Sequence, residues 1–142
     1  MQKATEDNIL LLRLDHDEDI ISSLNMAISE KKGTLMIVAA LGMMHKFEIG
    51  YFDEGKYIKK KIEEPVELLT MSGSVSSQGE NRIHIHVSLA DRDHNSIGGH
   101  LFSGKVWMSE EILLLRLPNI ISERIIDPMK RVGVLQLLSN RD

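Results

Sequence analysis

Short apolar segments with the spacing of strands recur along most of the chain, and one segment has the spacing of a helix. Residues 8–14 form a compact apolar run that is typical of a buried strand. Apolar and other side chains alternate over residues 47–51, which predicts a strand with one buried face. Between them, apolar side chains recur every three to four residues, and we predict one helix over residues 17–31.

Both ends of this helix carry recognisable signals. Asp15 is followed three residues later by Glu18, which is the spacing of an N-cap with its reciprocal acidic partner. Gly33 follows the cationic residues near position 31, as expected where a helix stops.

The remaining patterns predict a fold that consists mostly of strands. Further strands are predicted at residues 34–41, 57–62, 66–75, 82–90, 99–108 and 112–117, with a bend or bulge at 72–74 and a final apolar run at 134–138. We therefore expect a single α+β domain over residues 1–142, with one main helix and a mostly antiparallel sheet of about seven to eight strands. Several apolar strands would need covering by partner subunits, so homo-oligomerisation is expected.

Composition narrows the class of protein. The chain has 142 residues, a formal net charge of −4 and no cysteine, which excludes disulfides and any site built on thiolates. The longest apolar run, residues 35–44, is too short to span a bilayer, and residues 1–6 show no secretion signal, so we expect a cytoplasmic protein without a membrane segment. The acidic balance argues against a simple non-specific DNA binder.

Three of the six histidines fall in one predicted hairpin. In residues 83–89 the apolar side chains occupy the odd positions, so His84 and His86 project together from the opposite face of the strand. If His86 lies opposite His100, Ile85 and Leu101 also line up, and all three histidines share a face. The glycines at 98–99 leave room beside His100.

This arrangement predicts a site for a divalent metal. Three imidazole nitrogens on one side of an ion suit zinc and leave a coordination position open for water or substrate. Because imidazole binds metal in its neutral form, its ordinary pKa predicts weaker binding below about pH 6.5. Three neutral ligands leave the charge of the ion uncompensated, which favours a small anionic ligand. The alternative is that these histidines are solvated, or line a subunit cleft, without metal. For His16, His45 and His94 we expect no functional role.

The sequence resembles the PPC (plants and prokaryotes conserved) domain, which accompanies AT-hook motifs in plants, in its stand-alone prokaryotic form. The resemblance covers nearly the whole chain. It is carried by residues 12–14, 17–19, 39–42, 66–69, 72–74, 84–91, 98–101 and 104–106. The His-x-His motif followed by Gly-Gly-His is its most specific element.

The resemblance implies a homotrimer in which His84, His86 and His100 bind metal. The fold is also similar to that of acetolactate decarboxylase, a zinc enzyme with a comparable histidine pattern. One hypothesis is therefore a homo-oligomeric metal-binding module with a regulatory or DNA-associated role. The alternative is a zinc-dependent enzyme acting on a small anionic, keto-acid-like substrate, with Glu67 as the first candidate for a general acid or base.

The sequence departs from the pattern of the plant proteins, which argues against the DNA-binding and partner-binding roles that the domain has in plants. The chain has no AT-hook, and its nearest basic cluster, residues 59–61, is expected to be a solvated edge strand. A Gly-Arg-Phe-Glu-Ile-Leu segment linked to partner binding in plants corresponds to residues 64–69, which lack the Gly-Arg-Phe part. Arg13 and Glu67 match family positions, where each could support the metal site, support an interface or pair with a neighbour.

Overall fold

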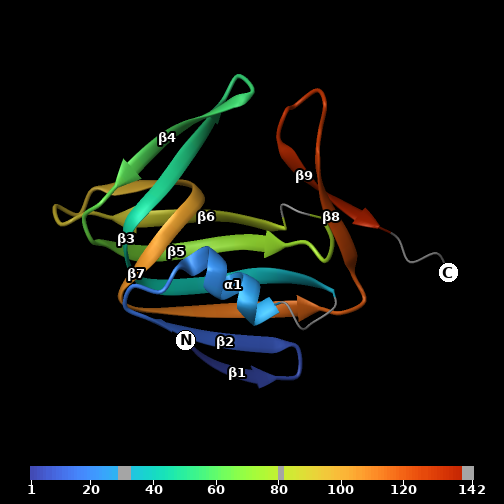
Figure 1. Ribbon diagram of the computed structural model, residues 1–142, viewed down its shortest axis with the longest axis horizontal. Helices are drawn as coiled ribbons and strands as arrows, with labels where there is room; N and C mark the ends of the chain where they lie inside the picture. The colour runs from blue at the N-terminus through green and yellow to red at the C-terminus, as the bar shows by residue number, and fades with distance from the viewer. Residues whose placement is uncertain (29–32, 80–81, 139–142) are drawn as a thin grey trace.

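A computed structural model describes residues 1–28, 33–79 and 82–138 of the chain (Figure 1). Its elements are β1 (Gln2–Glu6), β2 (Ile9–Asp15), α1 (Ile20–Ile28), β3 (Thr34–Asp53), β4 (Lys56–Ile62), β5 (Val66–Val75), β6 (Ile83–Ala90), β7 (Ser96–Leu117), β8 (Ile121–Ile126) and β9 (Gly133–Leu138). The described part of the chain includes no helix that is long and apolar enough to cross a membrane.

The strands form one large antiparallel sheet and one separate hairpin. Seven strands follow the order β1-β2-β7-β6-β5-β3-β4, and an additional pairing joins β7 to β3. The strands β3, β5, β6 and β7 therefore close a ring. The strands β8 and β9 form a two-stranded sheet of their own, and Figure 1 shows their hairpin and the β3–β4 hairpin as two arms that project from the same side of the large sheet. The prediction of a mostly antiparallel sheet with one helix is confirmed, whereas the likeness to acetolactate decarboxylase stays a prediction.

Two strands are much longer than the sequence patterns predicted. The predicted strands at 34–41 and 47–51 are both part of β3, and those at 99–108 and 112–117 are both part of β7. Their separation was wrong because register shifts between β3 and β7 let each strand bend without leaving the ladder. The edge strand β1 was missed because its polar sequence is exposed throughout and shows no buried face.

The helix begins later than predicted. It starts at Ile20, and the Oδ1 of Asp19 accepts a hydrogen bond of 2.8 Å from the backbone N–H of Ser22. Asp19 is thus the N-cap, and the prediction that Asp15 caps a helix from residue 17 was wrong. Glu18 accepts instead from the backbone N–H of Asp15 at 2.8 Å and holds the turn before the helix. The predicted helix end near residue 31 lies outside the described residues.

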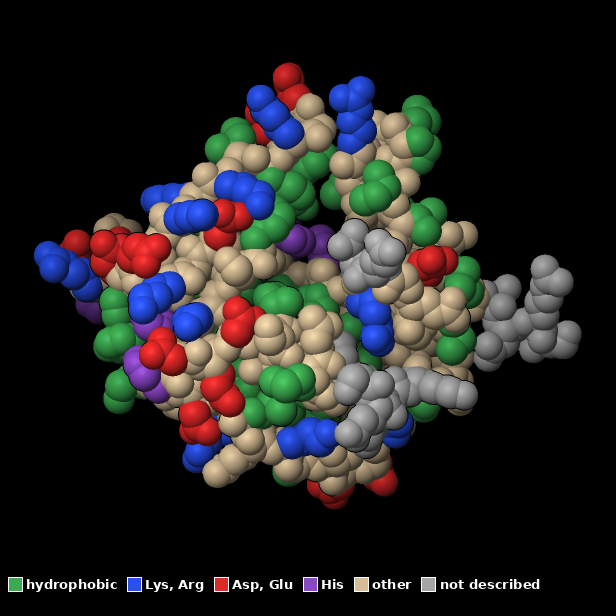
Figure 2. Space-filling model, viewed as in Figure 1, with side chains coloured by type: hydrophobic (Ala, Val, Ile, Leu, Met, Phe, Trp, Pro, Cys, Tyr) green, Lys and Arg blue, Asp and Glu red, His purple; other side chains and the backbone are tan. Residues whose placement is uncertain are grey.

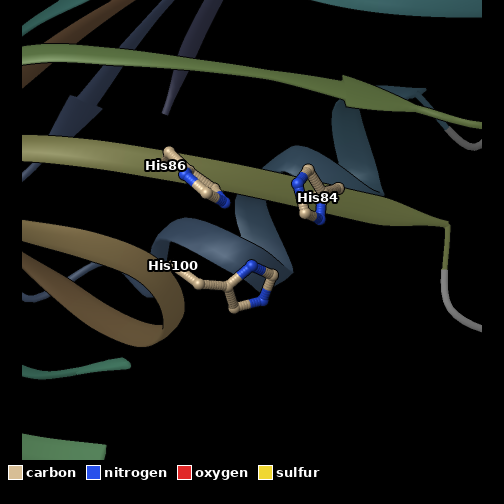
Figure 3. Close-up of side chains that lie close together, drawn as sticks. All are labelled: His84, His86 and His100. Atoms are coloured by element: carbon tan, nitrogen blue, oxygen red, sulfur yellow. The ribbon is translucent and has the colours of Figure 1, made fainter. Parts of the chain in front are cut away.

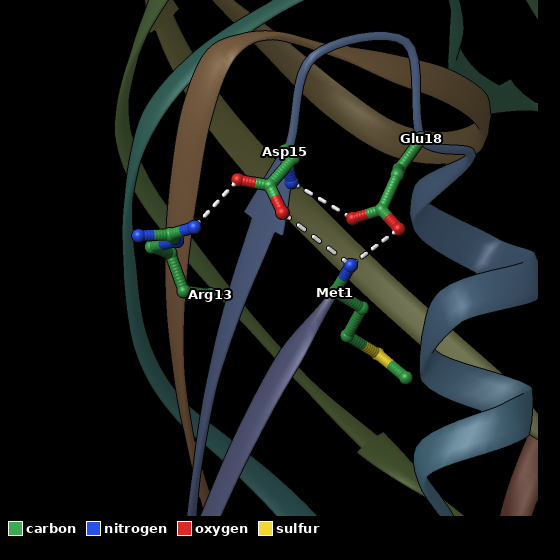
Figure 4. A network of polar contacts seen from close by, with 4 residues as sticks. All are labelled: Met1, Arg13, Asp15 and Glu18. Atoms are coloured by element: carbon green, nitrogen blue, oxygen red, sulfur yellow. Dashed lines mark hydrogen bonds and ion pairs between the residues drawn. The ribbon is translucent and has the colours of Figure 1, made fainter.

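A polar network ties the N-terminus to this turn (Figure 4). The N-terminal amine of Met1 lies 2.6 Å from Oε1 of Glu18 and 3.5 Å from Oδ2 of Asp15. Asp15 also accepts from Arg13 at 2.8 Å. Arg13 pairs in register with Glu111, at the other end of β7 from His100, so it belongs to this network and not to the histidine hairpin.

The core lies on the inner face of the sheet and beneath α1. Fully buried side chains come from β2, α1, β3, β5, β6 and β7; among the largest are Leu12, Ile20, Leu24, Phe47, Met71 and Ile85. Residues 72–74 continue β5 without the predicted bulge, which lies instead between Leu68 and Thr70. Gly73 is required for another reason, because a Cβ there would lie 2.1 Å from the carbonyl oxygen of His84. The core therefore holds β5 tightly against the strand that carries two of the candidate ligands.

Candidate metal centre

The three predicted ligands come together on two adjacent strands. His84 and His86 project from β6, and His86 lies directly opposite His100 of β7, as predicted (Figure 3). The predicted continuation of this pairing to Ile85 and Leu101 is wrong, because the β6–β7 ladder ends at the histidine pair. Beyond it β7 pairs with β3, where Gly50 lies opposite His100. His100 is therefore fixed between two neighbouring strands.

The rings converge closely enough to share one ion. One nitrogen from each of the three residues lies within 4.8 Å of the other two. The ring centroids are 4.9 Å apart for His84 and His86, 5.0 Å for His84 and His100, and 5.6 Å for His86 and His100. Nitrogens that share a tetrahedral zinc ion lie about 3.3 Å apart, so movements on the order of 1 Å would complete the set.

Burial keeps two of the rings in the neutral, ligand form. Desolvation, followed by the charges of Arg124 and His86, lowers the pKa of His84 to about 4. Desolvation, followed by the neighbouring histidines and then Arg124 and Lys59, lowers the pKa of His100 to about 4. For these two rings, protons would therefore compete with a metal ion near pH 4, which is lower than the pH of about 6.5 expected from the ordinary pKa of histidine.

The chemistry of the donor set fits zinc. Nδ1 of His100 is buried without a hydrogen-bond partner among the described residues, and such an atom is costly unless something binds it or its ring. Within the described ranges, no carboxylate belongs to the cluster. Three neutral nitrogens suit a borderline-soft ion such as zinc better than magnesium or calcium, which prefer oxygen.

Gly99 allows the close strand packing that positions His100. Its φ of +155° lies in a region that side-chain-bearing residues avoid, and a Cβ at this position would lie 2.7 Å from the carbonyl oxygen of Gly50. The glycines at 98–99 were expected to leave room beside His100, but at Gly99 the space is filled by the backbone of β3. Any side chain at residue 99 would push β7 away from β3 at the ligand.

A cavity of about 370 Å³ opens beside two of the ligands. It is lined by residues that include Tyr57, His84, His100, Phe102, Arg124 and Arg131. Figure 2 shows histidine side chains within a hollow between the two arms of the molecule. Tyr57 and Phe102 contact His100 with ring centroids 5.1 and 4.6 Å away, so the cavity has an aromatic wall next to the metal ligands.

Arg124 is the feature of the site that the sequence analysis missed. This β8 residue donates from Nη2 to Oγ of Ser74 at 2.7 Å and from Nη1 to the carbonyl oxygen of Gly133 at 3.3 Å. Ser74 lies opposite His84 in the β5–β6 ladder, so the guanidinium is held beside a candidate metal ligand. No local signal could have found it, because the contact joins segments 50 residues apart.

The other singled-out residues lie elsewhere. Glu67 is exposed on β5 and lies opposite Ala90, four residues and therefore about 13 Å along β6 from His86, which removes it as an acid or base at this site. His94 is exposed in the β6–β7 turn. His45 lies inside β3 and not at a strand boundary; it is buried and contacts Asp17 at 3.0 Å.

The basic cluster lies on an edge strand, as predicted. Residues 59–61 belong to β4, the last strand of the sheet. Lys59 contacts Glu48 at 2.6 Å, and its Nζ lies 3.9 Å from the centroid of the Phe102 ring. Lys59 is therefore already paired, both with a carboxylate and with the aromatic wall of the cavity.

Comparisons with known proteins identify the family and the fold. The model of the Plants and Prokaryotes Conserved (PCC) domain, also written PPC, matches residues 1–118. A metal-containing protein from Archaeoglobus fulgidus is 33% identical, with a TM-score of 0.78 and coverage of 97% of both chains.

Two further solved structures share the fold at 24% identity. A candidate DNA-binding protein from Ralstonia eutropha has a TM-score of 0.83, with 96% of both chains covered. A PPC protein from Pyrococcus horikoshii has a TM-score of 0.78, with 98% of this chain and 97% of that chain covered. A search of curated proteins finds no match.

Proposed function

The chain belongs to the Plants and Prokaryotes Conserved domain family, and we propose that it is a homo-oligomeric module of that family that binds a divalent metal ion. The ion, zinc in the first instance, is held by His84, His86 and His100. The observation that carries the proposal is the convergence of one imidazole nitrogen from each of the three residues within 4.8 Å, and the buried Nδ1 of His100, which has no partner among the described residues, adds to it. The related metal-containing protein from Archaeoglobus fulgidus supports it.

The histidines would supply all the protein ligands, and the ion would supply a Lewis acid with an open coordination position. Titration of untagged, metal-stripped protein with zinc, followed by calorimetry, tests this assignment. We expect one ion per chain, and we expect His100→Ala to abolish that binding. His94→Asn is the matched control, because it removes an exposed imidazole, and asparagine tolerates the φ of +63° at this position. Equal zinc binding by wild type and His100→Ala would refute the proposal.

Homo-oligomerisation is supported by an apolar strip on the outer face of the sheet. Ile9 lies opposite Leu115, which lies opposite Met36, and each of these side chains is more than one-third exposed. Leu11 continues the strip and lies opposite Leu113. Exposed contiguous apolar patches commonly mark protein–protein interfaces, and here further copies of the same chain would bury the patch.

The resemblance to the family implies three copies. Light scattering of the purified chain should therefore give a trimer, and Leu11→Glu should dissociate it. Met129→Glu, which alters a side chain that is 91% exposed outside the strip, should leave the assembly intact. A wild-type monomer at micromolar concentration would contradict this part of the proposal.

The relationship to DNA is proposed as indirect and regulatory. Neighbouring structures from Ralstonia eutropha and Bacteroides thetaiotaomicron are described as candidate DNA-binding proteins. This chain has a net charge of −4, and it lacks the AT-hook. We expect no retardation of duplex DNA in gel shifts at low salt; salt-sensitive retardation would show direct binding.

A second candidate function is a zinc-dependent enzyme that acts on a small anionic, keto-acid-like substrate. The observation that favours it is the cavity beside His84 and His100, which gives a substrate access to the open position on the metal. Turnover of such a substrate that persists with chelator and in His86→Ala would exclude this candidate.

A further inference from the structure

We propose that the cavity beside the metal centre binds a small carboxylic acid with a short apolar chain, and that Arg124 holds its carboxylate. The proposal rests on the proposed metal-binding function and adds the ligand class and an anchoring residue. The anchor comes from the β8–β9 hairpin, which follows the segment that matches the family model at residues 1–118.

The charge of the cavity selects an anion. Two arginines, Arg124 and Arg131, line it, and none of the described residues along its wall is aspartate or glutamate. An ion on three neutral imidazoles would add two further positive charges. This charge favours an anion, and a carboxylate is an anion that a guanidinium binds through charge-assisted hydrogen bonds.

Arg124 is fixed in position but still has donors to offer. A guanidinium carries five N–H donors, and the structure assigns one to Ser74 and one to Gly133. Nε is buried without a partner among the described residues, which adds to the unsatisfied donor capacity of this side chain. Because Ser74 lies opposite His84, a carboxylate bound to Arg124 would lie next to the metal ligands.

The rest of the cavity wall selects an apolar chain of limited length. Ile21, Ile83, Phe102, Ile126 and Val132 supply apolar side chains. A volume of about 370 Å³ is near the lower end of the usual range for small-molecule sites, about 300–1,000 Å³. The two arms approach each other above it, since a Cβ on Gly55 would lie 3.1 Å from Cδ of Arg131. This enclosure favours a compact branched acid over a long one.

Calorimetry on the zinc-loaded, full-length protein tests the proposal with 3-methylbutanoate as the probe. We expect saturable binding of 3-methylbutanoate and no binding of its uncharged amide. Arg124→Gln should weaken binding at least 10-fold, since hydrogen bonds to a charged group are worth about 1.5–3 kcal/mol. Arg92→Gln is the matched control, because Arg92 is 91% exposed in the β6–β7 turn and should have no effect.

Two further measurements keep the test decisive if Arg124→Gln fails to fold. Arg124→Lys keeps the charge and should retain part of the affinity. Ile126→Asn alters only the apolar wall and should reduce the preference for 3-methylbutanoate over acetate. Equal affinity for 3-methylbutanoate and inorganic phosphate, or unchanged binding in both Arg124 variants, would overturn the proposal.

The design separates this proposal from the metal assignment. If wild type binds zinc but not 3-methylbutanoate, the ligand proposal fails and the metal centre stands. If the chain binds no zinc but still shows binding of 3-methylbutanoate that depends on Arg124, the metal assignment fails and the carboxylate site stands.

Discussion

The structure holds two groups of neighbouring histidines, and they differ in what surrounds their nitrogens. In the first group, His84, His86 and His100 face one another; among the described residues, no carboxylate joins them and one buried nitrogen has no partner. In the second, His45 contacts Asp17 at 3.0 Å, and Nδ1 of His16 accepts from the backbone N–H of Met108 at 3.2 Å.

The second group is also packed as a structural cluster. The rings of His16 and His45 stack with centroids 5.6 Å apart, and both contact the edge or face of Trp107 at 4.8 and 4.9 Å. The histidines of the second group have partners within the protein, whereas the nitrogens of the first group converge on one another. The comparison teaches that convergence of nitrogens, and not the number of histidines, singles out a candidate metal centre.

The largest expected effect is a difference in zinc affinity between variants of the two groups. His84→Ala removes a proposed ligand, and loss of a ligand should cost more than the roughly 10–100-fold that loss of an outer partner costs. His16→Ala should leave the zinc affinity unchanged within about 2-fold. Competition with a chromogenic chelator measures both constants. A comparable loss in the two variants would erase the distinction between the groups.

Glu110 sharpens the comparison, because its carboxyl group is buried without a hydrogen-bond partner among the described residues but belongs to no cluster of candidate metal ligands there. Its side chain is fully buried, neither carboxylate oxygen has a partner among the described residues, and burial raises its pKa to about 8. In the unfolded chain the pKa of this carboxyl group is 4.5. Between pH 4.5 and pH 8 the folded protein therefore keeps a proton on Glu110 that the unfolded chain has lost. The free energy of unfolding should therefore fall as pH rises from 4.5 to 8.

The size of this loss is on the order of 4 kcal/mol, and it should disappear in Glu110→Gln. Urea unfolding at pH 5 and pH 8.5 measures it. Glu111→Gln changes the exposed neighbour and should retain the wild-type pH dependence. If the Glu110→Gln and wild-type stabilities run parallel across this range, the buried carboxyl does not titrate as described.

Gly99→Ala tests whether strand packing positions the first group. The added Cβ would meet the carbonyl oxygen of Gly50 at 2.7 Å and would occupy an unfavourable φ, which costs about 1–3 kcal/mol of stability. Zinc affinity should fall as well, because His100 is the next residue. Gly79→Ala shares the positive φ without a backbone collision, since its nearest atom lies 3.4 Å away, and it should leave zinc binding intact.

The smallest expected effect belongs to the second group. His45→Ala removes the contact with Asp17 and the packing on Trp107, and it should lower the free energy of unfolding by about 1–2 kcal/mol. Zinc binding should be retained. Thermal unfolding together with metal analysis checks both, and loss of zinc with an intact fold would mean that the second group also holds metal.

The histidine hairpin could be predicted because the alternation of apolar and polar residues constrains how its two strands pair. Shifting the pairing of His86 and His100 by one residue would place a histidine opposite a core side chain. The likeness to the family could also be read from the same motif. The prediction that residues 1–142 form one domain in the cytoplasm stays a prediction.

The rest of the site depends on contacts that no local pattern specifies. The sharp bends of β3 and β7 arise from shifts in their mutual register. Arg124 reaches the site from a hairpin outside the large sheet, and the helix cap moved to Asp19 because Glu18 was drawn into contacts with Asp15 and the N-terminus. Each of these features was fixed by tertiary packing.

The central claim is that three imidazoles share one ion, and X-ray absorption at the zinc edge on untagged protein tests it most directly. The account predicts one zinc per chain with three imidazole nitrogens at about 2.0–2.1 Å, recognised by the multiple scattering of their rings, and one exchangeable oxygen or halide ligand. The same spectrum from His86→Ala should lose this signature. A wild-type spectrum dominated by oxygen neighbours, or one that does not change in His86→Ala, would contradict the account.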